Sequence, residues 1–503
     1  MFALSENIIH KMVLQSEETR NASETCDVLI VGAGVSGINA AYQLQTKLPS
    51  VKLAIFEARD DIGGTWDLFR YPGVRPDSEL YTYGFAWDPW PYPDPIGNGP
   101  LIKQYLKDCV RRHEINQHIR FHHKVLSADW SQDSQQWRVI VKHDEQVIEV
   151  SASFLILGTG YYDYNSPLQT VIPGLEDFKG KVIYPQFWPD DYEYQNKNMA
   201  IIGSGATCVS LFPKLAEAAR QVTIVQRSPT YIISSKHMPP HLSKLLSFLP
   251  LPSYLLTRLD RAWNLFHAQM TAVFCEYFPA RARQVLRILA IPQLPKGFDY
   301  DLHFQPRYNP WEQRLCLAPD GDFFQSLHQP NTDIVTGDID KVTENSIRMQ
   351  DGTVLDVDAI VAATGLLMRF GGDIAISVDG EEMKWEQKLI WNGAMLDGVP
   401  NMMFMLGYTN FSWTLGADNS AHILIRLLKL MKSKGFRSAT PQRPEDNVET
   451  QKMWRLSSTY AARAHSQLPR YGMEGPWKPR IHALIDYFSS RWGDITSGLK
   501  FTS

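Results

Sequence analysis

The sequence predicts an α/β fold with two Rossmann-like dinucleotide-binding domains and a helical insertion. Two units, beginning near residues 28 and 199, carry this expectation, because in each a short apolar strand is followed by a Gly-x-Gly turn and a helix. The length of 503 residues suits roughly two to four domains. A content of 44% hydrophobic and 21% charged residues is typical of a folded globular chain.

The first unit has the features of a phosphate-binding turn. We expect a strand over 28–31 and a helix over 38–44, separated by three glycines, Gly32, Gly34 and Gly37. Glycines let the backbone approach a pyrophosphate, which the N–H groups at the helix start attract. A second strand over 51–56 leads to Glu57, about 20 residues after the last glycine, where a carboxylate meets a ribose hydroxyl.

The second unit repeats this order with one change. A strand over 199–202 leads into a turn whose residues include Gly203, Ser204, Gly205 and Thr207. Cys208 stands where the third glycine would be. We expect this small residue to be tolerated at the helix start.

The end of the next strand distinguishes the two units chemically. The strand over 222–225 leads to Gln226, aligned with Glu57, and then to Arg227 and Ser228. A carboxylate here would repel a ribose 2′-phosphate, whereas arginine pairs with it and serine adds a donor. We therefore expect NADPH at the second unit and a dinucleotide with a free ribose at the first. This pairing indicates a flavoprotein; an ordinary solvated charge is the alternative for Arg227.

Net charge and cysteine spacing argue against a nucleic-acid-binding protein and against a cysteine-based metal site. A net charge of −4 gives no basic field for nucleic acid. The five cysteines form no Cys-x-x-Cys pair, so we expect no metal site and a reducing, cytoplasmic location. We expect residues 1–24 to be an N-terminal arm without secretory features, and no run is long enough for a transmembrane span.

Residues 231–301 read as a helical insertion. Apolar residues recur at helical spacing in two runs: Leu242, Leu245, Leu246 and Leu249, then Leu255, Leu259, Trp263, Phe266 and Met270. We expect amphipathic helices that bury this stripe against the NADP-binding domain. The alternative is a face for peripheral contact with a membrane or for a partner.

A fingerprint directly follows Glu57. It begins at Gly63-Gly64-Thr65-Trp66, continues through Tyr71-Pro72-Gly73 and ends at Asp77. At every fixed position it resembles the fingerprint of Baeyer–Villiger monooxygenases, Gly-Gly-x-Trp, four residues, Tyr/Phe-Pro-Gly, three residues and Asp. The resemblance extends through Ala363-Thr364-Gly365. Within the family, the segment from Arg307 to Arg314 is most similar to the branch that includes the ethionamide-activating enzyme.

The resemblance, together with the two units, implies FAD and NADPH as cofactors. The expected cofactor-binding residues are Gly32, Gly34, Gly37, Glu57, Gly64, Thr65, Trp66, Tyr71, Asp77, Gly203, Ser204, Gly205, Thr207, Arg227, Ser228, Thr364 and Gly365. Packing beside the flavin is the alternative role for Trp66 and Tyr71.

The resemblance also implies the chemistry. NADPH reduces FAD, O2 adds at flavin C4a, and the peroxide attacks a ketone carbonyl to give an ester or lactone. A fixed cation in a dry cavity meets the negative charge best. The resemblance assigns that role to Arg314, with Asp77 as the orienting carboxylate. Arg307 is the rival cation, and a structural ion pair is the alternative reading of Arg314 and Asp77.

One position departs from the family. Its second fingerprint, Phe-x-Gly-x-x-x-His-x-x-x-Trp followed by Pro or Asp, runs here from Phe178 to Pro189 with Tyr184 in place of histidine. A phenol stays neutral at working pH, so it cannot switch charge as imidazole does. We expect oxygenation to survive with altered coupling to NADPH oxidation.

The expected domains follow from these positions. They are an arm at 1–24, an FAD-binding domain at 25–165 and 366–503, an NADP-binding domain at 166–230 and 302–365, and the insertion at 231–301.

The expected function is an NADPH-dependent, FAD-containing Baeyer–Villiger monooxygenase that acts with O2 on a hydrophobic ketone. Two alternatives stay open: a flavin monooxygenase that oxidises nitrogen or sulfur, and a non-oxygenating NADPH-dependent flavoprotein.

Overall fold

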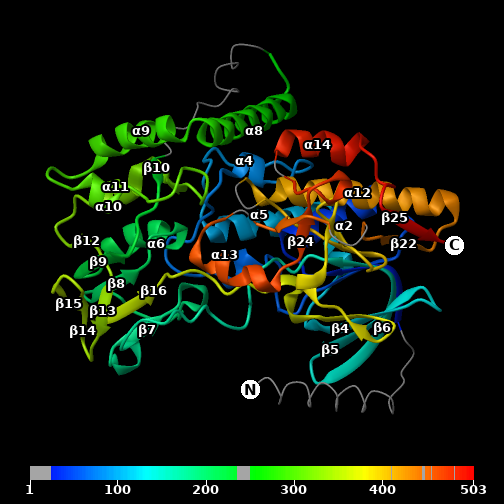
Figure 1. Cartoon of the computed structure of the whole chain (residues 1–503), viewed down its shortest axis with the longest axis horizontal. Helices are drawn as coiled ribbons and strands as arrows, with labels where there is room; N and C mark the ends of the chain where they lie inside the picture. Colours follow the sequence, from blue (N-terminus) through cyan, green and yellow to red (C-terminus); the bar gives the residue numbers. More distant parts are fainter. Residues whose placement is uncertain (1–23, 235–249, 409–410, 445–447, 455, 481) are drawn as a thin grey trace.

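The computed structural model describes residues 24–234, 250–408, 411–444, 448–454, 456–480 and 482–503. The predicted N-terminal arm up to residue 23 and the first leucine run, 242–249, lie outside these residues. Two sheets with their helices occupy opposite ends of the molecule (Figure 1), so the predicted α/β class is confirmed.

The larger sheet contains the first predicted unit. Its order is β18-β17-β4-β5-β6-β1-β2-β3, and β21 also pairs with β6. The strands are β1 (Glu24–Val31), β2 (Leu53–Phe56), β3 (Ile119–Arg120), β4 (His123–Ser131), β5 (Gln136–His143), β6 (Gln146–Leu157), β17 (Ala375–Val378), β18 (Glu381–Glu382) and β21 (Met402–Phe404). The last four residues of β1 are all buried, as expected for a strand covered on both faces.

The second sheet contains the second predicted unit. Its order is β12-β9-β8-β16-β7, with every pair parallel. The strands are β7 (Lys181–Ile183), β8 (Asn198–Ile202), β9 (Gln221–Gln226), β12 (Thr332–Thr336) and β16 (Ala359–Ala362). Because β12 and β16 come after the helical insertion, the chain leaves this sheet and returns to complete it.

The other strands form small sheets beside these two. They are β10 (Ile232–Ser234) with β11 (Cys316–Ala318), β13 (Ile339–Val342) with β14 (Ser346–Met349) and β15 (Val354–Asp356), β19 (Ile390–Trp391) with β20 (Met395–Leu396), β22 (Ser438–Pro441) with β25 (Leu499–Thr502), and β23 (Thr450–Lys452) with β24 (Arg470–Gly472).

Helices cover the sheets and connect them. The α-helices are α2 (Val35–Lys47), α3 (Thr65–Leu68), α4 (Leu80–Tyr83), α5 (Gly99–Arg112), α6 (Ala206–Ala216), α8 (Ser253–Tyr277), α9 (Pro279–Ala290), α10 (Tyr300–His303), α11 (Asp322–Ser326), α12 (Trp413–Lys434), α13 (Thr459–Ala464) and α14 (Ala483–Trp492). The 3-10 helices are η1 (Ile115–His118), η2 (Leu175–Asp177), η3 (Pro185–Phe187), η5 (Ile291–Gln293), η6 (Pro319–Gly321), η7 (Phe370–Asp373), η8 (Trp385–Gln387), η9 (His465–Gln467) and η10 (Gly475–Trp477).

The helix α8 confirms the second amphipathic run of the insertion but not its predicted packing. Arg261 donates to the backbone carbonyls of Tyr81, Thr82 and Gly84, so α8 rests on α4 beside the larger sheet. Phe266 and Met270, expected to be buried, are 49% and 42% exposed. The predicted burial of these two residues is therefore wrong, because the side of α8 that faces the protein carries small and polar residues, such as Ala272 and Asn264, instead.

The length and the apolar character of these helices decide whether one of them could cross a membrane. Among the described residues, no helix is both long and apolar enough to span a bilayer, including α8 with its 25 residues.

Candidate functional site

The first glycine turn has the predicted form. Gly32 has φ of +99°, and a Cβ there would lie 2.8 Å from the carbonyl oxygen of Gly158. A Cβ at Gly37 would lie 1.9 Å from the carbonyl oxygen of Gly32. Gly34 is the N-cap of α2 and supplies no side-chain cap. The N–H groups at the start of α2 are therefore left for an external anion, which fits a pyrophosphate.

Glu57 lies at the end of β2 and is tied to this turn. Its carboxylate accepts hydrogen bonds from the backbone N–H groups of Ala33 (2.7 Å) and Arg59 (3.0 Å). Burial raises the pKa of Glu57, and the two N–H donors oppose that rise. The acid is thus beside the glycine turn, where it fits a ribose hydroxyl.

A central cavity with an empty volume of about 1100 Å³ lies in front of this turn. It is lined by residues from both glycine turns and from the fingerprint. The predicted site residues that line it are Gly34, Gly64, Thr65, Trp66, Tyr71, Asp77, Thr207 and Arg314. The structure therefore brings the predicted catalytic pair and the fingerprint residues to one place, whereas of the predicted NADP-binding residues only Thr207 lines this cavity.

Arg314 and Asp77 form an ion pair in the wall of the central cavity. The Arg314 Nη1 to Asp77 Oδ1 distance is 2.5 Å, and the two side chains are 25% and 23% exposed. Burial would lower the pKa of Arg314, but the charge of Asp77 and the phenols of Tyr161, Tyr162 and Tyr460 outweigh it and raise that pKa. Arg314 is therefore a permanent cation facing the cavity.

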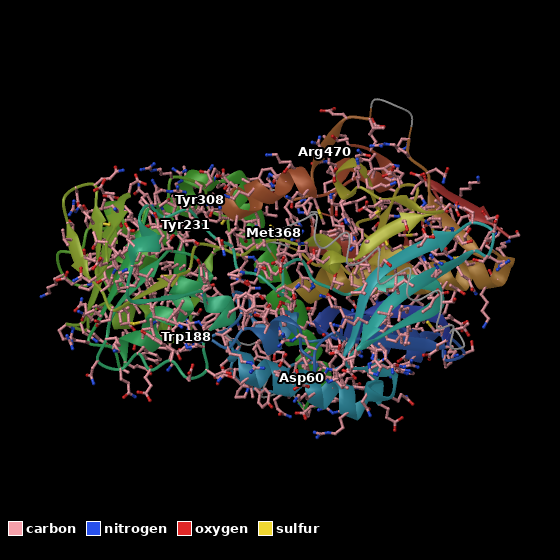
Figure 2. The ribbon with its side chains drawn as sticks, turned by 90° about the horizontal axis from the view of Figure 1, so that it is seen from below. Asp60, Trp188, Tyr231, Tyr308, Met368 and Arg470 are labelled. Carbon is pink, nitrogen blue, oxygen red and sulfur yellow. The ribbon has the colours of Figure 1, made fainter. Side chains whose placement is uncertain are left out.

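The segment that carries Arg314 is held by Tyr231 and by the two-stranded sheet of β10 and β11. The Tyr231 hydroxyl donates to the carbonyl oxygen of Tyr308 at 3.0 Å, and Figure 2 shows the two residues next to each other. β10 and β11 then pair in parallel, and β11 begins at Cys316, two residues after Arg314. The cation is thus anchored on both sides in the sequence.

Trp66 and Tyr71 are buried in the cavity wall and are both hydrogen bonded. Trp66 Nε1 donates to the Tyr83 hydroxyl at 2.6 Å, and the Tyr71 hydroxyl lies 3.2 Å from Ser210 Oγ. These bonds fix the two rings as parts of the wall. The geometry supports the packing role more than a chemical one.

The second glycine turn is more open than the first. Gly203 has φ of +130°, and a Cβ there would lie 2.3 Å from the carbonyl oxygen of Ala363. A Cβ at Gly205, the uncapped N-cap of α6, would meet nothing within 4 Å. Cys208 is buried at the third position, and Ser204 Oγ donates to the Ser228 carbonyl at 2.7 Å. This turn also leaves a helix start available for a phosphate.

Arg227 and its neighbours lie at the edge of the second turn. β8 and β9 are adjacent parallel strands, so Gly203 and Arg227, which follow them, emerge at the same edge of the sheet. Arg227 is exposed, and its Nη2 donates to Thr459 Oγ1 at 3.4 Å. This weak bond leaves the guanidinium available for a phosphate. The hydroxyl of Thr364, another predicted cofactor residue, accepts a hydrogen bond from the Thr170 hydroxyl at 2.9 Å.

Tyr184 lines a small cavity next to the central one. Tyr71, Thr207 and Gly365 contribute to the same small cavity, which is walled by both halves of the molecule. Tyr184 is half-buried and precedes η3. The departure from the family is therefore located where the two predicted cofactor units meet.

Sequence reasoning missed several residues of the central cavity. Arg75 lies at an unspecified position of the fingerprint and pairs with Asp322, 247 residues away, and it also donates to the carbonyl of Val209. Tyr161 and Tyr162 follow β6, and their hydroxyls lie 2.6 Å apart. Their position at the carboxyl end of a parallel strand was a usable signal.

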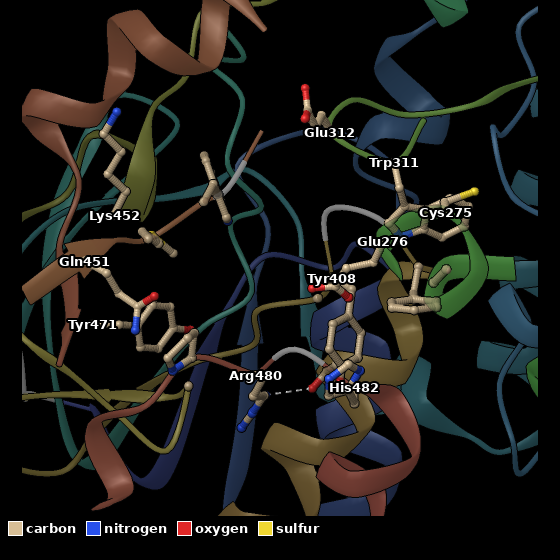
Figure 3. Close-up of a pocket in the computed structure, with 18 of the residues that line it drawn as sticks. Cys275, Glu276, Trp311, Glu312, Tyr408, Gln451, Lys452, Tyr471, Arg480 and His482 are labelled. Atoms are coloured by element: carbon tan, nitrogen blue, oxygen red, sulfur yellow. Dashed lines mark hydrogen bonds between the residues drawn. The ribbon is translucent and has the colours of Figure 1, made fainter. Parts of the chain in front are cut away.

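A second, outer cavity has an empty volume of about 1320 Å³ (Figure 3). Glu276 and Trp311 face Gln451 and Tyr471 across it. The other aromatic side chains that line it are Tyr408, Phe411 and Trp454. The Trp454 ring lies 5.1 Å from that of Tyr161 in the wall of the central cavity, so the two cavities share an aromatic partition.

No cluster of three or more His, Cys, Asp or Glu side chains that could hold a metal ion occurs among the described residues. The candidate site is built from helix starts, the ion pairs of Arg314 and Arg75, and aromatic walls.

Comparison of the chain with known proteins agrees with this geometry. A family model described as flavin-binding monooxygenase-like matches residues 25–246. The FAD-containing monooxygenase EthA of Mycobacterium tuberculosis is 41% identical over 482 residues, which are 95% of this chain and 98% of the relative. The probable FAD-binding monooxygenase AlmA of Acinetobacter baylyi is 38% identical over 463 residues, with 92% of each covered.

Solved structures with the same fold have low sequence identity. Cyclohexanone monooxygenase bound to ε-caprolactone superposes with a TM-score of 0.73 at 19% identity, covering 95% of this chain and 100% of the other. Oxidised steroid monooxygenase bound to NADP gives 0.72 at 21% identity with the same coverage. The predicted resemblance is thereby confirmed for the fold and, through the curated relatives, for the family. The chain belongs to the flavin-binding monooxygenase-like family.

Proposed function

We propose that this flavin-dependent monooxygenase inserts one oxygen atom of O2 next to a ketone carbonyl, giving an ester or lactone. The observation that carries the proposal is the Arg314–Asp77 pair, which faces the cavity where both glycine turns meet. An oxygenase acting on a carbonyl must stabilise negative charge, and a fixed cation in a cavity shielded from water does this.

The two turns divide the cofactors. The first turn and Glu57 hold FAD, and the second turn with Arg227 and Ser228 holds NADPH. The sheet arrangement supports the division of the chain into 25–165 with 366–503 and 166–230 with 302–365, because β21 returns to the larger sheet and β12 and β16 to the smaller one. FAD bound at the first turn and reduced by NADPH supplies the chemistry that activates O2.

The residues of this chain provide position and electrostatics. Arg314 holds positive charge beside the reacting carbonyl oxygen, and Asp77 orients the guanidinium through the 2.5 Å bond. Trp66 and Tyr71, held by their own hydrogen bonds, keep the wall rigid and limit the entry of water.

The outer cavity supports an apolar substrate. Its lining is rich in Trp, Tyr and Phe, while charged side chains such as Glu276 and Lys452 are exposed at its edge. An aromatic cavity adjoining the cation suits a hydrophobic ketone. That one structural relative is a cyclohexanone monooxygenase bound to a lactone supports the same reaction type.

The five cysteines are all buried and unpaired, which supports the proposal that the protein works in the reducing cytoplasm.

Oxidation of nitrogen or sulfur is the second candidate, because family membership alone does not select the ketone reaction. Purified protein supplied with NADPH should be assayed in parallel on a cyclic ketone and an aryl thioether. We expect lactone to form. Sulfoxide without any ester or lactone would overturn the ketone reaction and leave a monooxygenase of heteroatoms.

A further inference from the structure

The helix α8 buries polar side chains together with the small residues Ala272 and Cys275, and it exposes large apolar side chains. Asp260, Asn264 and Gln269 are buried on the side that faces the protein. Phe266 and Met270 are exposed on the other side. A surface helix of a globular protein normally has the opposite arrangement, so the exposed side of α8 is suited to an apolar partner.

The helix α14 continues this surface. Its residues Ile485, Phe488 and Trp492 recur at helical spacing and are all exposed, Trp492 to 69%. Gln269 of α8 is hydrogen bonded to His482, the N-cap of α14, at 3.3 Å, and Figure 1 shows the two helices on the same side of the molecule. The exposed apolar side chains of both helices therefore belong to one layer.

We use the name apolar face for six residues of this layer. They are Tyr277, Phe278, Ile288, Ile485, Phe488 and Trp492. Elsewhere in the described chain, exposed large apolar residues such as Val171 and Val354 lie singly on other elements. Single exposed residues are ordinary on protein surfaces, whereas concentration on one helical layer marks an interaction site.

The charges beside the apolar face are basic. The helix α9 contains Arg281, Arg283 and Arg287 and no acidic residue. Arg287 pairs with Asp301, and Arg283 is half-buried and donates to Asn309 at 2.7 Å, whereas Arg281 is exposed and forms no ion pair with a described residue. Arginines beside exposed Trp, Tyr and Phe are the composition of helices that lie in the headgroup region of a bilayer.

We propose that the apolar face docks onto the surface of an anionic lipid bilayer without crossing it. The aromatic and aliphatic side chains enter the headgroup boundary, while the exposed Arg281 meets lipid phosphates. The acidic residues nearest in sequence to this face are Glu276, which lines the outer cavity, and Asp486, which accepts a hydrogen bond from the Tyr408 hydroxyl at 2.6 Å.

The same helices build the wall of the outer cavity. Cys275 of α8, Pro279 of α9 and His482 at α14 line it. A docked enzyme would therefore take apolar substrate from the lipid into this cavity. This last step rests on the proposed function; the docking itself does not.

The test is co-sedimentation of the full chain with vesicles. We compare vesicles of phosphatidylcholine alone with vesicles of phosphatidylcholine and phosphatidylglycerol in equal parts, without NADPH or ketone. The face variant is Ile288→Ser with Ile485→Ser, Phe488→Ser and Trp492→Ser. The matched control variant is Val171→Ser with Val354→Ser, which changes exposed apolar residues away from the helical layer.

We expect the parent and the control variant to bind the anionic vesicles, less so at high salt, and the face variant to bind at least about tenfold more weakly. Equal binding of parent and face variant would overturn the proposal. A lack of binding of the parent to the anionic vesicles would also overturn it, and a dimer that the face variant abolishes, seen by sedimentation velocity, would then assign the face to a second copy of the chain. If docking occurs but the face variant oxidises lipid-dissolved ketone as well as the parent does, only the substrate route fails.

Discussion

Replacing Arg314 by alanine tests the cation to which we assign the proposed ketone reaction. The change removes the guanidinium that lies 2.5 Å from Asp77 and faces the central cavity. Because both side chains are only about one quarter exposed, removing one partner costs more than the about 0–1 kcal/mol of a surface ion pair, but less than the roughly 5–15 kcal/mol by which folded proteins are stable. We therefore expect the variant to fold and to retain flavin.

The expected loss is in the oxygenation step. Removing one fixed donor to a developing negative charge typically lowers kcat by about 10²–10³, or about 3–4 kcal/mol of barrier. Arg314 remains charged at every working pH, since the charge of Asp77 raises its pKa despite burial. We expect ester formation to fall by at least about 100-fold. NADPH oxidation should persist, because Arg314 is not part of the second glycine turn.

Arg307 provides the matched control. It lies in the same segment, is exposed, and does not line the central cavity. Ester or lactone is quantified by gas chromatography, together with NADPH consumption and the flavin absorbance of each variant. Ester formation at the parent rate in Arg314→Ala, or an equal loss in Arg307→Ala, would refute the role of Arg314.

Gly37→Ala would place a methyl group 1.9 Å from a backbone oxygen of the same turn. We therefore expect less bound flavin and a lower melting temperature than in Cys208→Gly, its counterpart in the second turn. Equal flavin content in the two variants would contradict this. Arg227→Ala should raise KM for NADPH by about 10- to 100-fold and leave KM for NADH unchanged in steady-state assays; a parallel rise in both would exclude a phosphate contact. Tyr184→His should alter the ratio of ester to hydrogen peroxide per NADPH, and an unchanged ratio would show the substitution to be neutral. Burial raises the pKa of Glu79 from 4.5 to about 7. Between these two pH values the folded state therefore holds a proton that the unfolded state has lost, so the melting temperature of the parent relative to that of Glu79→Gln should fall as pH rises. A difference in melting temperature that stays constant with pH would disprove this.

The local parts of the fold were predictable from the sequence because their signals lie within a few residues. The strand before Gly32 and the helix after Gly37 are β1 and α2, and the steric contacts of both glycines explain why no other residue serves there. Cys208, at the third position of the second turn, departs from this requirement for glycine. The Cys208 side chain is buried in the second turn, and the pattern of glycines in the sequence does not explain how this turn accommodates it.

The orientation of α8 was not predictable from its periodicity. Helical spacing identifies an apolar stripe, but it does not say which side of the helix rests on the protein. Here Arg261 and Asn264 lie toward the protein while Phe266 faces outward. The outcome is decided by carbonyl groups at and after α4 that need a donor, and these are about 180 residues away in the sequence. The pairing of Arg75 with Asp322 was hidden for the same reason.

Three arginines join the two halves of the molecule around the cofactor cavities. Arg314 reaches Asp77 from the segment after the insertion, Arg75 reaches Asp322 in the opposite direction, and Arg227 contacts the start of α13. Each contact crosses between chain segments far apart in sequence, so each depends on how the two sheets are placed. Partly exposed polar contacts cost little to break and re-form, unlike an apolar core. If Arg314 and Arg227 meet anionic groups as proposed, the contacts between the halves depend on the same arginines, and we expect a phosphate at Arg227 to compete with its contact to Thr459 at the start of α13.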